Sequence, residues 1–492
     1  MTKIINLQSY KTRYFNWVIE QPKIVISLSF LLVLIMGFGI TKVHKESSVD
    51  AFVPQDHPAA LARDRAADIF GLEDPIVVGL VAPNNTSVFT PENIETLRRI
   101  EEQIGILPNV KKHNFISILH ENSIRGDNGD LIVERIVPDG PVSIQVAKKA
   151  FERVNSMSMM KGLLASKNGD ALILIVPVYD ANHATETYRK VLAIANAESR
   201  PNLAVHVTGV ASMNGRLALM LTQDTAKFIP AAIVMALLVV WAALRNLRGL
   251  IGPFYIIAGS AAMTIGVMGW SGAQYYLITT ALPVIIMAIA IADSLHISTV
   301  FLHKCSVQTN KSRQQNLLDA LNHTYLPITL TTITTVAGFT GLALGSTMQP
   351  ISEFSCFAAV GALMAWVLSL TALPAIIILT NLNSQAKEGQ TEFTLVDKCI
   401  RTVTVQAFDK PVLTSGLAAL YIFVMSYFAL QATFDYQRQS YFKDNEQVKI
   451  ADVTLNERLS GLNFLDVVVS GKEHGDLMTL KAMQDIDSLQ KT

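Results

Sequence analysis

Apolar residues in this chain gather into seven runs, separated by stretches in which polar and apolar positions mix as in globular proteins. A helix needs roughly 17–25 apolar residues to cross the hydrocarbon core of a bilayer. Seven runs of that length argue against buried core helices of a soluble protein. We therefore expect membrane helices at Ile24–Ile40, Phe228–Leu244, Leu250–Gly269, Ile278–Leu302, Leu326–Gly345, Phe354–Leu379 and Val412–Leu430.

The stretch between the first and second runs follows strand and helix patterns in alternation. Thr90-Pro91-Glu92 supplies an N-cap hydroxyl, a proline and an acid, which together begin a helix. We expect helices at Ala59–Phe70, from Thr90, at Val142–Met157 and at Ala184–Glu198, and strands at Ile76–Ala82, Leu131–Val137, Ala171–Val178 and Leu203–Thr208. This alternation predicts a compact domain that mixes helices and strands. Gly71 should end the first of its helices, Ala59–Phe70.

Basic residues fix the expected orientation of the helices. Lys and Arg precede the first helix, recur between the second and third and between the fourth and fifth, and precede the seventh. The turns at Ser271–Tyr275 and Ser346–Ile351 carry no positive charge. Because basic loops stay in the cytoplasm, the stretch after the first helix should lie outside it. The first helix lacks a small-residue cleavage site, so we expect an uncleaved signal anchor.

These patterns divide the chain into seven parts. We expect a cytoplasmic N-terminus (1–23), a first membrane helix (24–43), an extracytoplasmic domain (44–227), a five-helix membrane bundle (228–382), a cytoplasmic linker with an amphipathic helix at Phe393–Phe408 (383–411), a seventh membrane helix (412–431) and the start of a second extracytoplasmic domain (432–492).

Composition agrees with a membrane protein. Half of the 492 residues are hydrophobic, 16% are charged and the mean hydropathy is +0.35. The net charge is zero, so we expect no nucleic-acid partner. Cys305, Cys356 and Cys399 all fall in cytoplasmic or membrane positions, which leaves the outer domain without a disulfide.

No catalytic, nucleotide-binding or metal-binding motif occurs in the outer domain. Its histidines are scattered rather than spaced as metal ligands, and we interpret them as surface or strand residues: His113, His120, His183 and His206. We therefore expect no enzyme, no cofactor and no bound metal.

The end of the chain repeats its beginning at an offset of 390 positions. Phe52 and Gly71 recur as Phe442 and Gly461, and the strand pair Val77-Val78 recurs as Val467-Val468. Two tandem halves are implied, and the second stops after one strand and one helix of its outer domain. The chain is then a fragment, a split subunit or a half that assembles with a missing second half or as a homo-oligomer.

Three segments resemble the resistance–nodulation–division (RND) superfamily, and within it the MMPL-type and hydrophobe/amphiphile exporters. They are Phe52-Val53-Pro54 with Ile69-Phe70-Gly71 and the following strand, AIAIADSLHI at Ala288–Ile297, and the long segment Pro327–Ile378. The second resembles the family's G-x-x-x-D segment, although Ile289 stands where glycine is common and Ser294 where a second acid or tyrosine is common.

The resemblance implies a fold and a function. The fold is a polytopic α-helical membrane protein with an extracytoplasmic α+β domain, porter-like and ferredoxin-like βαβ, in a truncated RND-type tandem repeat. The five-helix bundle is similar to sterol-sensing domains of the Patched and Niemann–Pick type. The implied function is export of lipids or other hydrophobic or amphiphilic compounds from the inner membrane, driven by protons, with the large loop in the bacterial periplasm.

Asp293 is the main candidate functional residue. A carboxylate near the middle of a bilayer costs about 2.5–3.5 kcal/mol on insertion scales, so such residues usually face a bundle interior or a water path. Ser294 and His296 follow on the same helix, and imidazole titrates near neutral pH. We interpret Asp293, Ser294 and His296 as a proton relay; the alternative is a polar packing cluster that never titrates.

The next helix supplies the supporting residues. Thr331, Thr334 and Thr335 either donate hydrogen bonds to Asp293 across the bundle or satisfy their own backbone. Gly341 and Gly345 form a G-x-x-x-G pattern, which is typical of close helix packing.

Two other functions compete with transport. One is a lipid- or sterol-sensing membrane receptor, and the other is an accessory subunit of protein translocation. The intramembrane Asp293 disfavours the receptor. The seventh helix disfavours the accessory subunit, because such chains stop after six helices.

Overall fold

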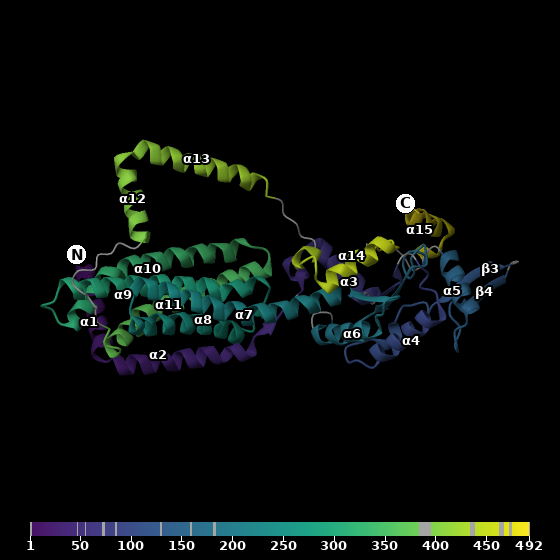
Figure 1. Cartoon of the computed structure of the whole chain (residues 1–492), viewed down its shortest axis with the longest axis horizontal. Coiled ribbons are helices and arrows are strands. Elements are labelled where there is room, and N and C mark those ends of the chain that lie inside the picture. Colours follow the sequence, from purple (N-terminus) through teal and green to yellow (C-terminus); the bar gives the residue numbers. More distant parts are fainter. Residues whose placement is uncertain are drawn as a thin grey trace. The chain divides into compact units, whose positions relative to one another are not determined.

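The computed structural model describes residues 2–491 except 47, 55, 71–73, 84–85, 128–129, 158–159, 181–183, 383–394, 433–437, 462–466 and 472–474. It divides into two compact units, a helical unit of residues 1–45 and 223–441 and an α/β unit of residues 46–222 and 442–492 (Figure 1). The helix stop expected at Gly71 and the histidine at position 183 lie outside the described residues, as does the side chain of Cys399.

The helical unit contains the membrane-spanning segments. Its helices are α1 (Thr2–Glu20), α2 (Pro22–Gly37) with the 3₁₀ turn η1 (Phe38–Lys42), most of α7 (Val210–Leu244), α8 (Ile251–Ser271), α9 (Leu282–Val307), α10 (Arg313–Gly345), α11 (Gln349–Leu379), α12 (Leu395–Asp409) and α13 (Pro411–Leu430). Seven of them, all except α1 and α12, are long and apolar enough to cross a membrane. The prediction of a multi-pass helical membrane protein is therefore confirmed.

Glycines bring α2 and α8 into close contact. A Cβ atom on Gly266 would overlap the carbonyl oxygen of Met36, and one on Gly269 would overlap the carbonyl oxygen of Gly39. Gly39 in turn faces the backbone of Gly266. Helices in lipid gain their association energy from such close packing, so this glycine contact fixes α2 on α8. A short parallel pairing of β1 (His44–Lys45) with β7 (Gln274–Tyr275) follows it.

The α/β unit contains most of the remaining elements. They are α3 (Pro58–Phe70), β2 (Ile76–Val81), α4 (Pro91–Gly105), β3 (Asn122–Asp127), β4 (Asp130–Arg135), α5 (Ile144–Ser156), β5 (Ala171–Val176), α6 (Thr185–Glu198), β6 (Ala204–Thr208), α14 (Gln447–Arg458) and α15 (Leu480–Lys491). Thr90 caps α4 as its sequence predicts, because its hydroxyl accepts a hydrogen bond of 3.2 Å from the amide of Asn93.

The main sheet has the order β5-β2-β6, and β2 is antiparallel to both neighbours. The strands β5 and β6 are thus parallel to each other, joined through α6, with β2 between them. This is a split βαβ arrangement. Isolated bridges from Val110 to Val178 and from Ile116 to Ile175 extend the sheet beyond β5.

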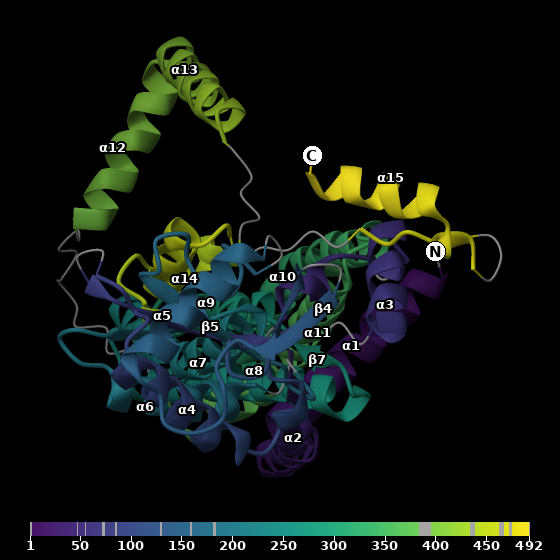
Figure 2. The same cartoon turned by 90° about the vertical axis from the view of Figure 1, so that its right-hand side faces the viewer.

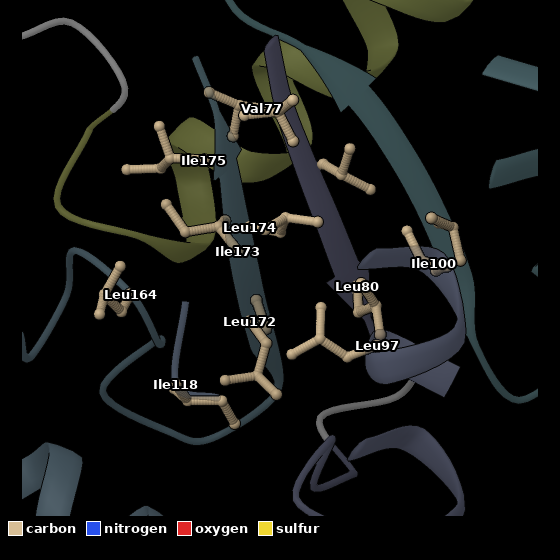
Figure 3. Close-up of a cluster of buried hydrophobic side chains, with 14 of the residues drawn as sticks. Val77, Leu80, Leu97, Ile100, Ile118, Leu164, Leu172, Ile173, Leu174 and Ile175 are labelled. Atoms are coloured by element: carbon tan, nitrogen blue, oxygen red, sulfur yellow. The ribbon is translucent and has the colours of Figure 1, made fainter. Parts of the chain in front are cut away.

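Helices cover both faces of this sheet. Every residue of β2 and β5 is buried, so an apolar surface must be covered on each side. On one side α4 and α6 lie next to each other (Figures 1 and 2), and Leu97 and Ile100 of α4 approach Leu80 (Figure 3). On the other side Leu455 of α14 lies against Gly79, at the centre of β2.

Two strand predictions differ from the structure. The strand expected at Leu131–Val137 is β4 of a hairpin whose partner β3 was not expected, because the sequence Asn122–Asp127 is polar and lacks an apolar run. The strand expected at Val467-Val468 is wrong for this chain: residues 467–471 form no strand in the part that the structure describes, since no described segment pairs with them.

Candidate functional site

Asp293 lies near the middle of α9, on its buried face. Asp293 is only 5% exposed, and its helix is long and apolar enough to cross a membrane. Its Oδ2 atom has no hydrogen-bond partner among the described residues. Keeping a buried carboxylate without a partner in its anionic form costs free energy. Binding of a proton to Asp293 would remove that cost.

The surroundings of Asp293 are apolar. Ala290, Ile297 and Phe301 share its face of α9, are fully buried and belong to one hydrophobic cluster with residues of α8, α10 and α11. No Lys, Arg or His forms an ion pair with Asp293 in the described part of the chain. The site therefore holds one ionisable group in a setting that offers it no counter-charge.

The structure separates the three expected relay residues. Ser294 is fully buried and donates its hydroxyl to the carbonyl oxygens of Ala290 and Ile291, at 2.7 and 3.0 Å. His296, about 60° around α9 from Asp293, is exposed. A shared helix face was inferred from the three-residue spacing, but the buried face of α9 includes position 293 and excludes position 296.

The threonines of α10 bond to their own helix. Thr331 donates to the carbonyl of Ile328 at 2.8 Å and Thr334 donates to that of Thr331 at 2.9 Å. Both side chains are exposed, and Thr335 is half-buried. Of the two roles considered, a hydrogen bond to the helix's own backbone is the one seen for Thr331 and Thr334. The structure pairs none of the three threonines with Asp293.

Gly341 and Gly345 have open space beside them. A Cβ atom on either residue, or on Gly338, would meet nothing within 4 Å among the described residues. The helix packing expected there is not seen in the part of the chain that the structure describes. These glycines lie on an exposed surface of α10 that also carries Thr331 and Thr334, next to large exposed apolar side chains such as those of Leu330 and Leu342.

Sequence reasoning missed two serines on α11. The hydroxyls of Ser355 and Ser369 are buried and without a hydrogen-bond partner in the described chain, like that of Ser298 on α9. Gly361 of α11 packs on Ile286 of α9, and both helices run in the same direction. Asp293 is seven residues beyond Ile286 and Ser369 is eight beyond Gly361, so at about 1.5 Å per residue they lie at similar depth.

Helix α1 was not expected from the sequence. Phe15 is buried against Tyr325 of α10, with ring centroids 5.8 Å apart, and the Lys11 ammonium lies 5.4 Å from the same tyrosine ring. An open groove of about 980 Å³ beside it is lined by Lys11, Arg13, Trp17 and Asn322, among others. Aromatic and basic residues in this combination are typical of a membrane interface.

The α/β unit holds a second polar site. Glu101 is buried and accepts hydrogen bonds from the hydroxyl of Ser117 and, at 3.1 Å, from the Nε2 of His120. Burial raises the pKa of the Glu101 carboxyl above its ordinary value. Residues 112, 113 and 135 line the adjoining pocket of 330 Å³, so two of the scattered histidines, His113 and His120, meet there.

Comparison with known proteins decides the family. Residues 126–393, more than half of the chain, match the MMPL family. The chain belongs to the MMPL family. This confirms the resemblance drawn from residues 288–297 and 327–378, both of which lie inside the match.

A relative of this MMPL protein is known from Methanocaldococcus jannaschii, where it is named as a membrane protein, MJ1562. The two chains are 19% identical over 371 residues, which make up 73% of this chain and 91% of the relative. The MMPL family suggests a membrane transporter of hydrophobic compounds. The multi-pass helical unit agrees with that assignment.

Proposed function

We propose that this chain is one half of a proton-driven exporter of lipids or other hydrophobic or amphiphilic molecules, seated in the cytoplasmic membrane. The observation that carries the proposal is Asp293: an ionisable side chain, buried in a membrane-spanning helix, among apolar residues and without a counter-charge. Such residues mark ion pathways and proton relays in membrane proteins. Binding and release of a proton at Asp293 would then drive the transport cycle.

The neighbours of Asp293 receive supporting roles. We assign His296 to the continuation of the proton path on the exposed side of α9, and Ser294 to holding the local helix through its backbone hydrogen bonds. Ser369 lies on α11 at the depth of Asp293, and its hydroxyl would offer a further hydrogen-bonding group to water molecules that carry the proton. The proposal needs no catalytic residue, no metal and no cofactor, so it describes a transporter rather than an enzyme.

A second bundle completes the proposed transporter. Gly338, Gly341 and Gly345 have open space beside them on α10, and small residues of this kind let another helix approach closely. α13 is apolar enough to span the membrane and has no buried residue in the described chain. The missing bundle comes either from a second half or from another copy of the chain.

Orientation follows from the basic residues. With Lys11, Arg13, Arg248 and Lys304 on the cytoplasmic side, the α/β unit lies outside the cytoplasm, in the periplasm of a bacterium. Its split βαβ sheet is then the porter-like domain that receives the exported molecule.

Transport into vesicles tests the proposal. The complete assembly, purified from its own membranes, is placed in lipid vesicles with a fluorescent phospholipid, and a pH gradient is imposed. We expect movement of the lipid only while the gradient lasts, and none after an uncoupler is added. Lipid binding without movement would favour the sensing receptor instead, and stimulation of protein secretion alone would favour the translocation subunit.

A further inference from the structure

Helix α1 lies across the end of the membrane bundle. Gln21 interrupts the helix with φ −117° and ψ 52°, because a proline disfavours helical geometry in the residue that precedes it. The spanning helix α2 begins at Pro22, and α1 runs across the axis of α2 (Figures 1 and 2). A helix that turns in this way at the start of a membrane span lies along the membrane surface.

The two sides of α1 have different surroundings. Three of its side chains are buried against the bundle: Phe15, Val18 and Ile19. Three aromatic side chains on the open side are at least 40% exposed: Tyr10, Tyr14 and Trp17. Their spacings of four and three residues place them on one side of the helix. Tyr and Trp gather at the level of the lipid headgroups, so this side of α1 lies at that level.

The groove of about 980 Å³ beside α1 carries charges of both signs. Lys11 and Arg13 line it towards the start of the helix, and Glu20 lines it next to the membrane span. At about 1.5 Å per residue, the backbone positions of Arg13 and Glu20 are about 10 Å apart along the helix. The groove is therefore positive at one end and negative at the other.

These charges are not neutralised by the part of the protein that the structure describes. The Lys11 ammonium lies 5.4 Å from the centre of the Tyr325 ring, a cation–π contact that orients it without supplying a negative charge. Arg13 and Glu20 form no ion pair with any described side chain. Two cations and one anion thus line a single cavity at the membrane surface.

A phospholipid headgroup has the complementary arrangement of groups. Its phosphate is an anion that Lys and Arg bind through charge-assisted hydrogen bonds. The terminal ammonium of ethanolamine, or the terminal hydroxyls of glycerol, can donate a hydrogen bond to the Glu20 carboxylate. A free phosphate would meet Lys11 and Arg13 but would leave Glu20 without a donor, so the full set of groups favours a lipid.

We infer that this groove binds one phospholipid of the adjacent leaflet, with its phosphate on Lys11 and Arg13 and its terminal donor group on Glu20. The leaflet is the cytoplasmic one in the orientation proposed above. Asn322 of α10 also lines the groove, so the bound lipid joins α1 to α10. This lipid is a bound part of the fold, distinct from the molecules proposed to be exported, and the site does not depend on transport.

Native mass spectrometry of the full-length protein in detergent counts bound phospholipids directly. Phosphatidylethanolamine, phosphatidylglycerol and phosphatidylcholine with identical acyl chains are added separately. We expect the first two to be retained, and phosphatidylcholine to bind at least about threefold more weakly, because its trimethylammonium group has no N–H to donate to Glu20. Equal retention of phosphatidylcholine and phosphatidylethanolamine would mean that Glu20 does not contact the headgroup, and would overturn the inference.

Lys11→Gln with Arg13→Gln tests the phosphate contacts. Retention of phosphatidylethanolamine should fall by at least about tenfold, because hydrogen bonds from charged groups are lost. Arg245→Gln with Arg248→Gln is the matched control: it removes two exposed basic residues at the same end of the bundle, between α7 and α8, that do not line the groove. Equal losses in the two double variants would indicate a general effect of charge and contradict a defined site. Unfolding midpoints without lipid check that each variant keeps its fold.

Two further measurements separate a lipid from a free anion. Glu20→Gln should bring phosphatidylethanolamine and phosphatidylcholine closer in retention, because the uncharged amide is a weaker acceptor for the ammonium. Inorganic phosphate in excess should leave the bound phosphatidylethanolamine in place. Displacement of the lipid by inorganic phosphate would show a site for the free anion and overturn the assignment to a phospholipid.

Discussion

Leu455 lies on Gly79 at the centre of the main sheet, in the space that any larger residue at position 79 would fill. Six membrane-spanning helices, α7 to α11 and α13, separate the two residues along the chain, yet they form one fully buried contact. The sheet therefore depends on chain that follows α13.

Leu455→Ala should loosen the strands that α14 covers. Removing a buried leucine side chain costs about 2–5 kcal/mol, because part of the cavity remains. Amide hydrogen exchange of the full-length protein should show faster exchange in β2 and β6. Val453→Ala, on the exposed side of the same helix, is the control and should leave those rates unchanged. Equal rates in both variants would mean that α14 does not stabilise the sheet.

Gly266→Ala should destabilise the helical unit. The added Cβ overlaps the carbonyl oxygen of Met36, and overpacking of this kind typically costs about 1–3 kcal/mol. Thermal unfolding of the protein in detergent reports the change as a lower midpoint. Gly338→Ala makes the same substitution where nothing lies within 4 Å, so its midpoint should stay at or above that of the wild type. A midpoint for Gly266→Ala as high as that of Gly338→Ala would contradict the close packing of α2 on α8.

Glu101 should make the α/β unit less stable as the pH rises. Burial raises the pKa of its carboxyl above the unfolded value, so the protonated form is favoured by folding. Its stabilising contribution is full below the unfolded pKa, near 4.5, and is lost as the pH rises through the folded pKa. Glu101→Gln should therefore gain stability relative to the wild type with increasing pH in this window.

A pH series of hydrogen exchange in α4 checks this expectation. Glu102→Gln, the exposed neighbour, should show no such trend relative to the wild type. A constant difference between Glu101→Gln and the wild type across the series would show that the carboxyl keeps its unfolded pKa.

Labelling with a membrane-impermeant maleimide checks the orientation. In the background without native cysteines, Arg125→Cys in β3 should react in intact cells, because the α/β unit is proposed to lie outside. Ser312→Cys, the N-cap of α10, should react only after the membrane is permeabilised. Both side chains are exposed, so access alone does not separate them. The reverse pattern would invert the proposed topology.

The long apolar runs of the sequence made the helical fold predictable. Runs such as Phe354–Leu379 exceed the bilayer length whatever their neighbours are, so their positions follow from hydropathy alone. Ile76–Val81 is equally apolar on both sides, which indicates a strand covered twice. The identity of its second cover, α14, did not follow, because nothing local in Gln447–Arg458 specifies a surface several hundred residues away.

The candidate site was predictable in part for a related reason. The cost of a charge in an apolar run singles out Asp293 without any knowledge of packing. Which face of α9 is buried depends on α8, α10 and α11, and this placed His296 on the exposed side. Gly341 and Gly345 have the spacing of a packing motif, but the glycines that bring helices together here are Gly39, Gly266 and Gly269, whose partner backbone is distant in sequence.

The proton-carrying role of Asp293 is the central claim, and Asp293→Asn tests it most directly. Asn keeps the size of the side chain but cannot bind and release a proton, so insertion and unfolding temperature should match the wild type. In vesicles with an imposed pH gradient, the complete assembly should lose proton-coupled export of lipid when it carries Asp293→Asn. Ser294→Ala should retain export, because that hydroxyl bonds only to its own helix, and His296→Ala should shift the pH dependence or slow the rate. Wild-type export by the Asp293→Asn assembly, under the same gradient, would contradict the account.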